Sequence, residues 1–369
     1  MLKTERMDRV RAALRAQGLT QMIVCDPKSV WYLTGVAVEP YERLLALYLP
    51  TEGEPVLFLN RLFNVPEPPC RTVWHTDTDK PVAQIAEVVD AGRPLGIDKE
   101  WPAKFLIPLM ETHPGMQVVL SSDCVDDCRA CKDAEEQTLM REASRINDAV
   151  NEAAKHYIKA GMTEREVAEF IDAQYRAHGC EGPSFTTIVS FGANAADPHH
   201  EPDDTVLKEG DCVLFDMGCV KRRYCSDMTR TWFCGQPTEK QAAVHDLVRR
   251  ANEAAEALIK PGVRLCELDA AARDLIAEAG YGAYFNHRLG HFIGQTDHEQ
   301  GDVSSASPLV AEEGYDLLHR AGRLPAGRIR RAGGGSGAGD RRRLRGAQPR
   351  LQGAARGGLN TKLPRHCQG

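Results

Sequence analysis

The sequence has no apolar run that approaches the 18 residues of a membrane-spanning helix. It also begins without the basic segment and apolar core of a secretory signal, because MLKTER leads directly into a charged helical pattern. These absences predict a soluble, cytoplasmic protein with no membrane partner. With 369 residues, 42% of them hydrophobic, the chain is long enough for two domains with a core in each.

The twelve cysteines do not form the pattern of a disulfide framework. Several stand singly in apolar segments, where cysteine behaves as a small hydrophobic residue, namely Cys25, Cys212, Cys219, Cys225 and Cys234. Cys124, Cys128 and Cys131 lie closer together, but their spacing matches no common zinc site and no fourth ligand is nearby. We therefore predict packing cysteines in a reducing compartment, with a metal site at these three as the alternative.

Residues 1–130 are predicted to form an α/β domain. A helical pattern covers residues 2–17 and ends at Gly18, and strand patterns follow at 21–25, 44–50 and 55–60. The apolar run 30–35 is also expected to be a strand. A helix at 82–91 and strands starting near 94 and 117 complete the domain, in which no residue has a catalytic pattern.

Residues 131–315 contain an internal duplication. The segments 153–179 and 254–280 align without gaps at an offset of 101, and they share Gly161/Gly262 and Gly179/Gly280 among other pairs. In both copies a helix ends at a glycine turn and a second helix runs on to a terminal glycine. The pattern predicts two half-domains about a pseudo-twofold axis, with any site at their junction drawing ligands from both.

The segment 211–235 is predicted to be a hairpin that carries two acids. Its strands are the apolar runs 213–215 and 231–233, and Asp216 and Asp227 stand next to them. A buried carboxylate costs several kcal/mol unless a cation or hydrogen-bond donors compensate it. Paired oxygen ligands favour a divalent metal. Alternatively, the acids face solvent and pair with Arg222 or Arg230.

Histidines gather in corresponding regions of the two half-domains. His287, His291 and His298 fall within twelve residues in the second half, and His199 and His200 share a loop in the first. A single histidine is more often a structural residue than a ligand. Five of the twelve histidines in two short segments favour chemistry at this place.

Three blocks carry a family resemblance: IVSFGANAADPHHEPDD, VLFDMGCVKRRYCSDMTRT and HRLGHFIGQTDHE. They resemble the metallopeptidase family of Xaa-Pro dipeptidase (prolidase), Xaa-Pro aminopeptidase and methionine aminopeptidase. The first domain resembles the creatinase/prolidase N-terminal domain, so that the match covers roughly residues 5–315. The resemblance implies an α/β architecture in which an α+β "pita-bread" catalytic domain follows the N-terminal one.

The resemblance also implies two divalent ions (Mn, Co or Zn) and peptide substrates with proline at the second position. Asp216 would bind one metal, Asp227 would bridge both, and His291 would bind one. His199 and His298 match two histidines that hold the scissile peptide's oxygen, and His287 matches a further histidine near the substrate. Similar proteins are often homodimers, which makes a homodimer an expectation here.

The chain departs from this family after residue 315. Two glutamate ligands are expected there, in Ile-Glu-Pro-Gly-like and Arg-Val-Glu-Asp-like blocks, but Arg320 stands near the first position. Residues 320–369 contain twelve Arg, twelve Gly and no Glu, Phe, Tyr or Trp. We hypothesise that a frameshift near codon 315 produced this Arg/Gly-rich tail (316–369) and replaced the last strands of the catalytic domain.

Two other functions fit parts of the sequence. A basic, disordered tail would bind nucleic acid and make the chain a non-catalytic binding protein, although we do not expect a nucleic-acid partner. A creatinase-like enzyme would hydrolyse a C–N bond without metal, but the retained Asp216, Asp227 and His291 argue against it. The expected function is therefore that of an Xaa-Pro metallopeptidase, impaired by the loss of two ligands.

Overall fold

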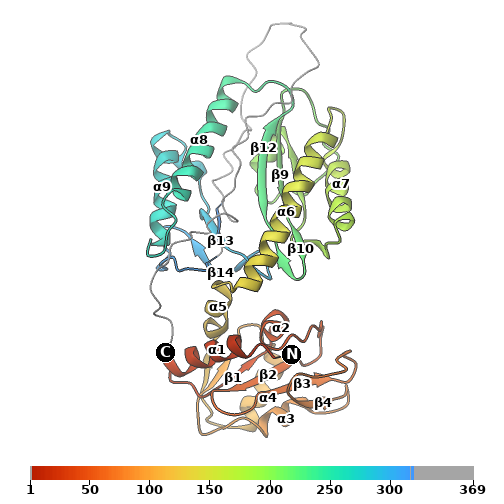
Figure 1. Ribbon diagram of the computed structural model, residues 1–369, viewed down its shortest axis with the longest axis vertical. Helices are drawn as coiled ribbons and strands as arrows, with labels where there is room; N and C mark the ends of the chain where they lie inside the picture. The colour runs from red at the N-terminus through yellow and green to blue at the C-terminus, as the bar shows by residue number, and fades with distance from the viewer. Residues whose placement is uncertain (1, 316, 320–369) are drawn as a thin grey trace. The chain divides into compact units, whose positions relative to one another are not determined.

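The computed structural model describes residues 2–315 and 317–319, which form two compact units divided between Arg129 and Ala130 (Figure 1). Both units mix helices and strands, as the sequence predicts. The tail predicted for residues 316–369 lies outside the described residues, apart from the strand at 317–319. Among the described helices, none combines the length and the apolar content needed to cross a bilayer.

The first unit is built on one six-stranded sheet with the order β4-β3-β2-β1-β5-β6. β2 pairs antiparallel with β1 and β3, whereas the outer pairs β3–β4 and β5–β6 are parallel. The elements are α1 Thr4–Ala16, β1 Gln21–Val24, α2 Pro27–Thr34, β2 Ala46–Pro50, β3 Val56–Asn60, β4 Arg71–His75, α3 Pro81–Ala86, β5 Leu95–Ile97, α4 Ala103–Thr112, β6 Val118–Leu120 and α5 Asp123–Ala130.

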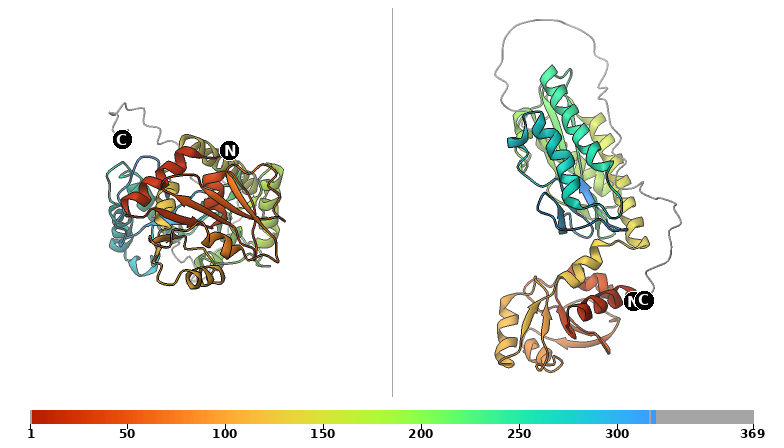
Figure 2. Two further views of the ribbon diagram at one scale, coloured as in Figure 1. Left: turned by 90° about the horizontal axis from the view of Figure 1, so that it is seen from below. Right: turned by 90° about the vertical axis from the view of Figure 1, so that its left-hand side faces the viewer.

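Helices cover both faces of this sheet, as two views show (Figures 1 and 2). Side chains alternate along each strand, so that Leu47 and Leu49 of β2 join one core while Ala46 and Tyr48 join the other. The first core contains residues of α1 and α2, and the second contains residues of α3 and α4. The first unit is therefore a three-layer α/β/α structure.

The run 30–35, predicted to be a strand, is part of helix α2, so this prediction is wrong. Asp26 caps the helix by accepting hydrogen bonds from the backbone N–H groups of Lys28 and Ser29, and Pro27 occupies the first turn. Gly35 ends it with φ of 74°. These capping signals outweigh the β preference of Val, Trp and Tyr.

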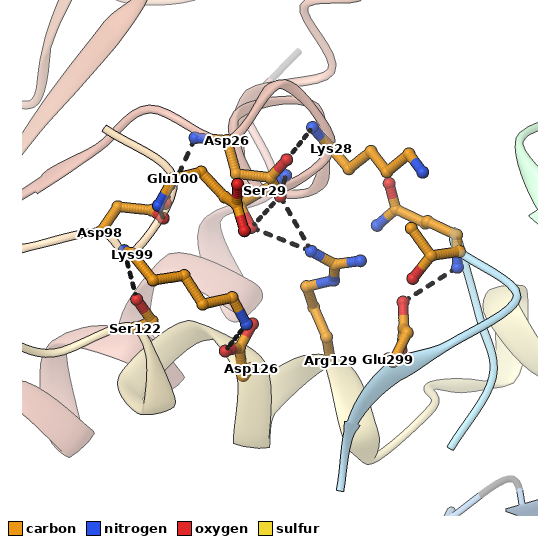
Figure 3. A network of polar contacts seen from close by, with 12 residues as sticks. Asp26, Lys28, Ser29, Asp98, Lys99, Glu100, Ser122, Asp126, Arg129 and Glu299 are labelled. Carbon is orange, nitrogen blue, oxygen red and sulfur yellow. Dashed lines mark hydrogen bonds and ion pairs between the residues drawn. The ribbon is translucent and has the colours of Figure 1, made fainter. Parts of the chain in front are cut away.

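The cap of α2 belongs to a polar network in the first unit (Figure 3). Arg129 of α5 donates to Asp26 and to the Ser29 hydroxyl, each at 3.0 Å. Lys99 reaches Asp126 of the same helix at 2.6 Å. These charged groups neutralise one another and connect α5 to the end of the sheet. Their role in this network is therefore structural.

The cysteines pack as predicted. Cys124 and Cys128 contribute to the first core of the N-terminal unit, and burial raises the pKa of the Cys124 thiol to about 12. Burial likewise raises the pKa of Cys212 and of Cys219 to about 12. The Cys131 thiol donates to the Glu313 carbonyl at 2.9 Å. Thiols with such raised pKa values are poor nucleophiles and poor metal ligands.

The second unit contains three small sheets, with the orders β12-β9-β8, β11-β10-β7 and β14-β13-β15. Its elements are α6 Ala134–Tyr157, α7 Glu164–Ala177, β7 Gly182–Pro183, β8 Ile188–Phe191, η1 Gly192–Ala196, β9 Cys212–Met217, β10 Cys219–Lys221, β11 Tyr224–Cys225, β12 Met228–Phe233, α8 Glu239–Glu256, α9 Leu265–Glu278, η2 Gly282–Tyr284, β13 Gly290–Phe292, β14 Glu299–Val303 and β15 Leu317–His319.

The internal duplication is confirmed by matching backbone contacts. Gly161 and Gly262 both follow the first helix of their copy, with φ of 95° and 91°. The N–H of Gly161 donates to the carbonyl of Leu207, and that of Gly262 donates to Ala311 in the same way, each at 2.9 Å. The helix pairs α6–α7 and α8–α9 lie side by side in the two copies (Figure 1). Each half-domain therefore repeats a helix–turn–helix–strand plan.

The predicted hairpin is formed by β9 and β12, which pair antiparallel with Asp216 opposite Thr229. Between them, β10 and β11 form a second, smaller hairpin. Gly218 joins β9 to β10 where any Cβ would collide with the Ser226 carbonyl. Only glycine fits this crossing, which brings the end of β9 close to the residues that precede β12.

The turn of the smaller hairpin offers a stability test. Arg222 and Arg223 have φ of 50° and 69°, the left-handed region that Asn and Gly adopt at lower cost. We expect Arg222→Asn combined with Arg223→Gly to raise the free energy of unfolding by about 1–2 kcal/mol in a urea titration. Arg222→Val, which adds a β-branched residue at positive φ, should lower it. An unchanged midpoint for both variants would contradict the strained turn.

Candidate metal centre

Asp216 faces away from the helices that cover its sheet. Its strand neighbours Phe215 and Met217 belong to the core formed with α6 and α7, so alternation turns Asp216 to the opposite face. The residue is fully buried, and its Oδ1 accepts a 2.7 Å hydrogen bond from the Thr229 hydroxyl on β12. A carboxylate is thus held, in one orientation, on the inner face of the hairpin.

Asp227 brings a second buried carboxylate to a residue of the other half-domain. It stands two residues before Thr229, and its side chain has no exposed surface. Its Oδ2 lies 3.6 Å from Nε2 of His291, which is on β13 and is also buried. The first half therefore supplies an acid and the second half an imidazole, as the duplication predicted for a junction site.

The hydrogen bond of His291 fixes which ring nitrogen bears the proton. Its Nδ1 lies 3.1 Å from the Phe292 carbonyl, which can only accept, so Nδ1 carries the hydrogen. In a neutral imidazole, Nε2 then presents a lone pair toward Asp227, and it has no hydrogen-bond partner among the described residues. A separation of 3.6 Å is too long for a hydrogen bond. A lone pair and a carboxylate facing each other in a buried site fit a divalent cation.

His298 joins this group through its ring. Its centroid lies 3.9 Å from that of His291. The Arg288 guanidinium approaches its Nδ1 at 3.4 Å, and because guanidinium only donates, Nδ1 is the acceptor. The proton of a neutral His298 is then on Nε2. Of the six predicted site residues, Asp227, His291 and His298 are brought together by these contacts, and Asp216 lies on the same hairpin face as Thr229.

His199 and His287 are placed by other contacts. His199 is exposed in the loop after η1, and its backbone N–H donates to the Asp197 carboxylate at 2.9 Å. Nδ1 of His287 donates to the Arg288 carbonyl at 2.7 Å, and its ring packs edge-on against Phe285. His199 lies in the loop that follows β8, and His287 lies in the loop that precedes β13. Their roles remain predictions.

The two arginines that could have compensated the acids lie elsewhere. Arg222 approaches Glu142 at 3.6 Å. Arg230 stands opposite Phe215, on the helix side of the sheet, and approaches Asp148 at 3.9 Å. Its pKa is lowered by burial. The alternative of a simple salt bridge between the hairpin acids and these arginines is therefore wrong.

A second group of metal-ligand residue types was missed in the sequence. Glu164, His200 and Asp203 offer ligand atoms within 4.8 Å of one another. However, Nε2 of His200 is only 2.6 Å from the Glu164 carboxylate, which is a hydrogen-bond distance and leaves a proton between them. The sequence indicated His200 without a role, whereas Glu164 looked like one more acid in the first turn of a helix.

The strand that would lead to the missing glutamates lies beside the site. β15 pairs antiparallel with β13, with Leu318 opposite His291. Arg320, predicted to stand near the position of the first glutamate, lies outside the described residues. The backbone of β15 thus pairs with the strand of His291 within the segment that follows residue 315, where the chain departs from the family pattern.

Comparison with known proteins gives matches over most of the chain. Residues 138–322 match the model of metallopeptidase family M24, and residues 6–131 match the creatinase/prolidase N-terminal domain. An uncharacterised peptidase of Staphylococcus epidermidis is 33% identical over 317 residues, which cover 85% of this chain and 90% of the relative.

Solved structures give the same result. A prolidase from Thermococcus sibiricus superposes with a TM-score of 0.80 at 30% identity, covering 86% of this chain and 89% of that one. The dipeptidase PepE from Mycobacterium ulcerans also has a TM-score of 0.80, at 32% identity, covering 85% and 86%. These likenesses include both units.

Proposed function

Because the chain belongs to metallopeptidase family M24 and carries a creatinase/prolidase N-terminal domain, we propose that it is by descent an Xaa-Pro peptidase whose hydrolysis is impaired. Such an enzyme cleaves the peptide bond that precedes proline. The observation that carries the proposal is the buried Nε2 of His291, which has no hydrogen-bond partner among the described residues and lies 3.6 Å from the Asp227 carboxylate. Solved relatives described as a prolidase and a dipeptidase support the substrate class.

Asp216, Asp227 and His291 would hold the metal, with Asp227 between two ions. Carboxylate and imidazole ligands accept Mn, Co or Zn. When bound, divalent ions lower the pKa of a coordinated water and polarise the carbonyl that it attacks. Burial of both carboxylates strengthens their attraction for a cation, because little water competes in the site.

The histidines supply donors for the oxygen of the scissile peptide. Since Arg288 holds Nδ1 of His298 as an acceptor, a neutral His298 carries its proton on Nε2, and this N–H would donate to that oxygen as negative charge develops on it. His199 would do the same from the other half-domain, and His287 would contact the substrate. The leaving nitrogen of proline also needs a proton, which a general acid must provide.

We propose that the impairment comes from the two missing glutamates. The match to the family model ends at residue 322, within the stretch 320–369 that has no Glu and whose single acid is Asp340. Three protein ligands remain of the five that the family pattern implies. The frameshift hypothesis is tested by reading the gene in its other two frames. Without Ile-Glu-Pro-Gly-like and Val-Glu-Asp-like blocks in either frame, it fails.

The proposed function is tested by a peptidase assay on the full chain. We expect little or no hydrolysis of Leu-Pro with added Mn²⁺ or Co²⁺. Any activity that remains should need the metal, should prefer Leu-Pro over Leu-Ala, and should disappear in Asp227→Ala. Release of free proline, followed by chromatography, is the measurement.

Three outcomes would contradict parts of this proposal. Rapid turnover of Leu-Pro would refute the impairment. Equal turnover of Leu-Ala would refute the preference for proline. Hydrolysis that persists in EDTA would refute metal dependence. Glu166→Gln, an exposed change at the start of α7 that keeps the capping interaction, serves as the control for handling and folding.

A further inference from the structure

Glu164 lies beneath the loop that carries His199. It is the first residue of α7, and although it is an acid it has no exposed surface. The loop runs from the end of β8 through η1 to residue 205. Helix capping is done by its neighbours Thr163 and Glu166, which form the capping box of α7. Glu164 is therefore buried for another reason.

Four donors on this loop converge on the Glu164 carboxylate. Oε1 accepts from the backbone N–H of Phe191 at 2.6 Å and from the side-chain amide of Asn194 at 3.0 Å. Oε2 accepts from Nε2 of His200 at 2.6 Å and from the backbone N–H of Asp203 at 3.2 Å. The contacts reach the beginning, the middle and the end of the loop, and His199 lies between them.

The second half-domain contains a comparable arrangement. Asp269 of α9 is fully buried and accepts from the backbone N–H of Leu289 at 3.1 Å. It also binds the Arg273 guanidinium, which donates to the carbonyls of Phe285 and His287 at 2.7 and 2.9 Å. α9 is the equivalent of α7 in the duplication. Glu164 is the first residue of α7 and holds the segment that follows β8, whereas Asp269 is the fifth residue of α9 and holds the segment that precedes β13, so the two carboxylates are alike in kind but are not equivalent positions.

We propose that Glu164 is a positioning residue that holds His199 at the active site, through the loop 192–205. The role of His199 rests on the proposed function, whereas the order that Glu164 imposes on the loop does not. The carboxylate suits this task because it only accepts hydrogen bonds and can satisfy four donors at once. In the other half-domain, Asp269 likewise holds a segment that carries a histidine, because its partner Arg273 donates to the carbonyl of His287.

Glu164→Gln removes the ability to accept four hydrogen bonds while the shape of the side chain hardly changes. Whichever way the amide turns, its NH₂ group faces two of the four donors. His200 can change tautomer and accept, but a backbone N–H of Phe191 or Asp203 cannot, so at least one buried donor is left without an acceptor. Glu166→Gln is the matched control, because it is the same substitution in the same turn of α7 and does not touch the loop.

Hydrogen–deuterium exchange of the full chain tests the positioning. In Glu164→Gln we expect residues 192–205 to exchange about tenfold faster, while residues 212–233 keep their wild-type rates. Glu166→Gln should change neither segment. His200→Leu, which removes one of the four contacts, should give a smaller increase confined to the same loop. Unchanged exchange at 192–205, or equal acceleration in both segments, would overturn the proposal.

A kinetic measurement separates this inference from the proposed function. Wherever Leu-Pro hydrolysis is measurable, Glu164→Gln should lower kcat about tenfold and change KM less, because an oxyanion donor is displaced. His200→Gln should keep the wild-type kcat, because Gln at position 200 can still donate a hydrogen bond to Glu164. A kcat that is lower in Glu164→Gln but not in His200→Gln therefore agrees with the proposal. An unaltered kcat would refute the role of His199 positioning in catalysis. If the impaired chain cleaves no Leu-Pro, the exchange experiment alone decides the role of Glu164, whereas rapid, metal-independent cleavage would refute the proposed function and leave the exchange result intact.

Discussion

A chain translated in the corrected frame after codon 315 should hydrolyse Leu-Pro about 10²- to 10⁴-fold faster than the chain as written. The present sequence keeps Asp216, Asp227 and His291 but has no Glu from 320 onward. Two further carboxylates would complete the ligand set and provide a group that transfers protons. General acid–base groups alone contribute a factor of this size.

The comparison is made at equal protein and Mn²⁺ concentrations by measuring proline release. The corrected chain with Asp227→Ala must be inactive, because this substitution removes a ligand that the new segment cannot replace. Equal rates for the corrected and the present chain would show that residues 316–369 already support catalysis. A corrected chain that folds, binds Mn²⁺ and stays inactive would refute the assignment of the substrate class.

The hairpin and the duplication could be predicted because their signals are local and periodic. Asp216 and Asp227 interrupt apolar strand patterns, and such a pattern fixes the face of each side chain once the strands pair. Gly161 and Gly262 mark equivalent turns, and glycine is needed there because φ is positive. These local signals therefore predict that the two half-domains meet near the hairpin acids.

Other features depend on contacts that the sequence does not show. The apolar residues of α2 favour a strand, whereas Asp26, Pro27 and Gly35 determine the ends of a helix, and the caps prevail in the folded chain. Glu164 could not be distinguished from its exposed neighbour Glu166, since only the fold brings Phe191, Asn194 and Asp203 to one of them. Burial decides between two similar acids, and burial is a property of the folded chain.

Asp227→Asn is expected to abolish stabilisation by Mn²⁺ and to make the metal-free protein more stable. In the wild-type chain, Mn²⁺ at one hundred times its Kd should raise the free energy of unfolding by about 2.7 kcal/mol. Without metal, Asp227 is a carboxylate whose side chain has no exposed surface, and a neutral amide removes much of the desolvation cost of that charge. We expect a gain of about 1–3 kcal/mol in EDTA.

Urea unfolding with EDTA and with Mn²⁺ measures both effects. The matched control is Asp172→Asn, an acid-to-amide change in the same unit whose carboxylate accepts from the Thr187 hydroxyl at 2.7 Å. Asp172 lies outside the proposed ligand set, so this variant should keep the Mn²⁺ shift. An undiminished Mn²⁺ shift in Asp227→Asn would show that the metal binds elsewhere, with Glu164, His200 and Asp203 as the first place to look.

The sign of the change in EDTA distinguishes a metal ligand from a structural acid. A carboxylate that stabilises the apo fold through a permanent ion pair would lose that pair in Asp227→Asn, and the variant would be less stable. The arginines nearest in sequence do not offer such a pair, because Arg222 approaches Glu142 and Arg230 approaches Asp148. Within the described residues, Oδ2 of Asp227 lies 3.6 Å from Nε2 of His291, and the Nδ1 hydrogen of that ring points to the Phe292 carbonyl. If Asp227 destabilises the metal-free protein, its value to the protein lies in binding a metal. A metal ligand therefore predicts that Asp227→Asn gains stability in EDTA and loses the shift caused by Mn²⁺.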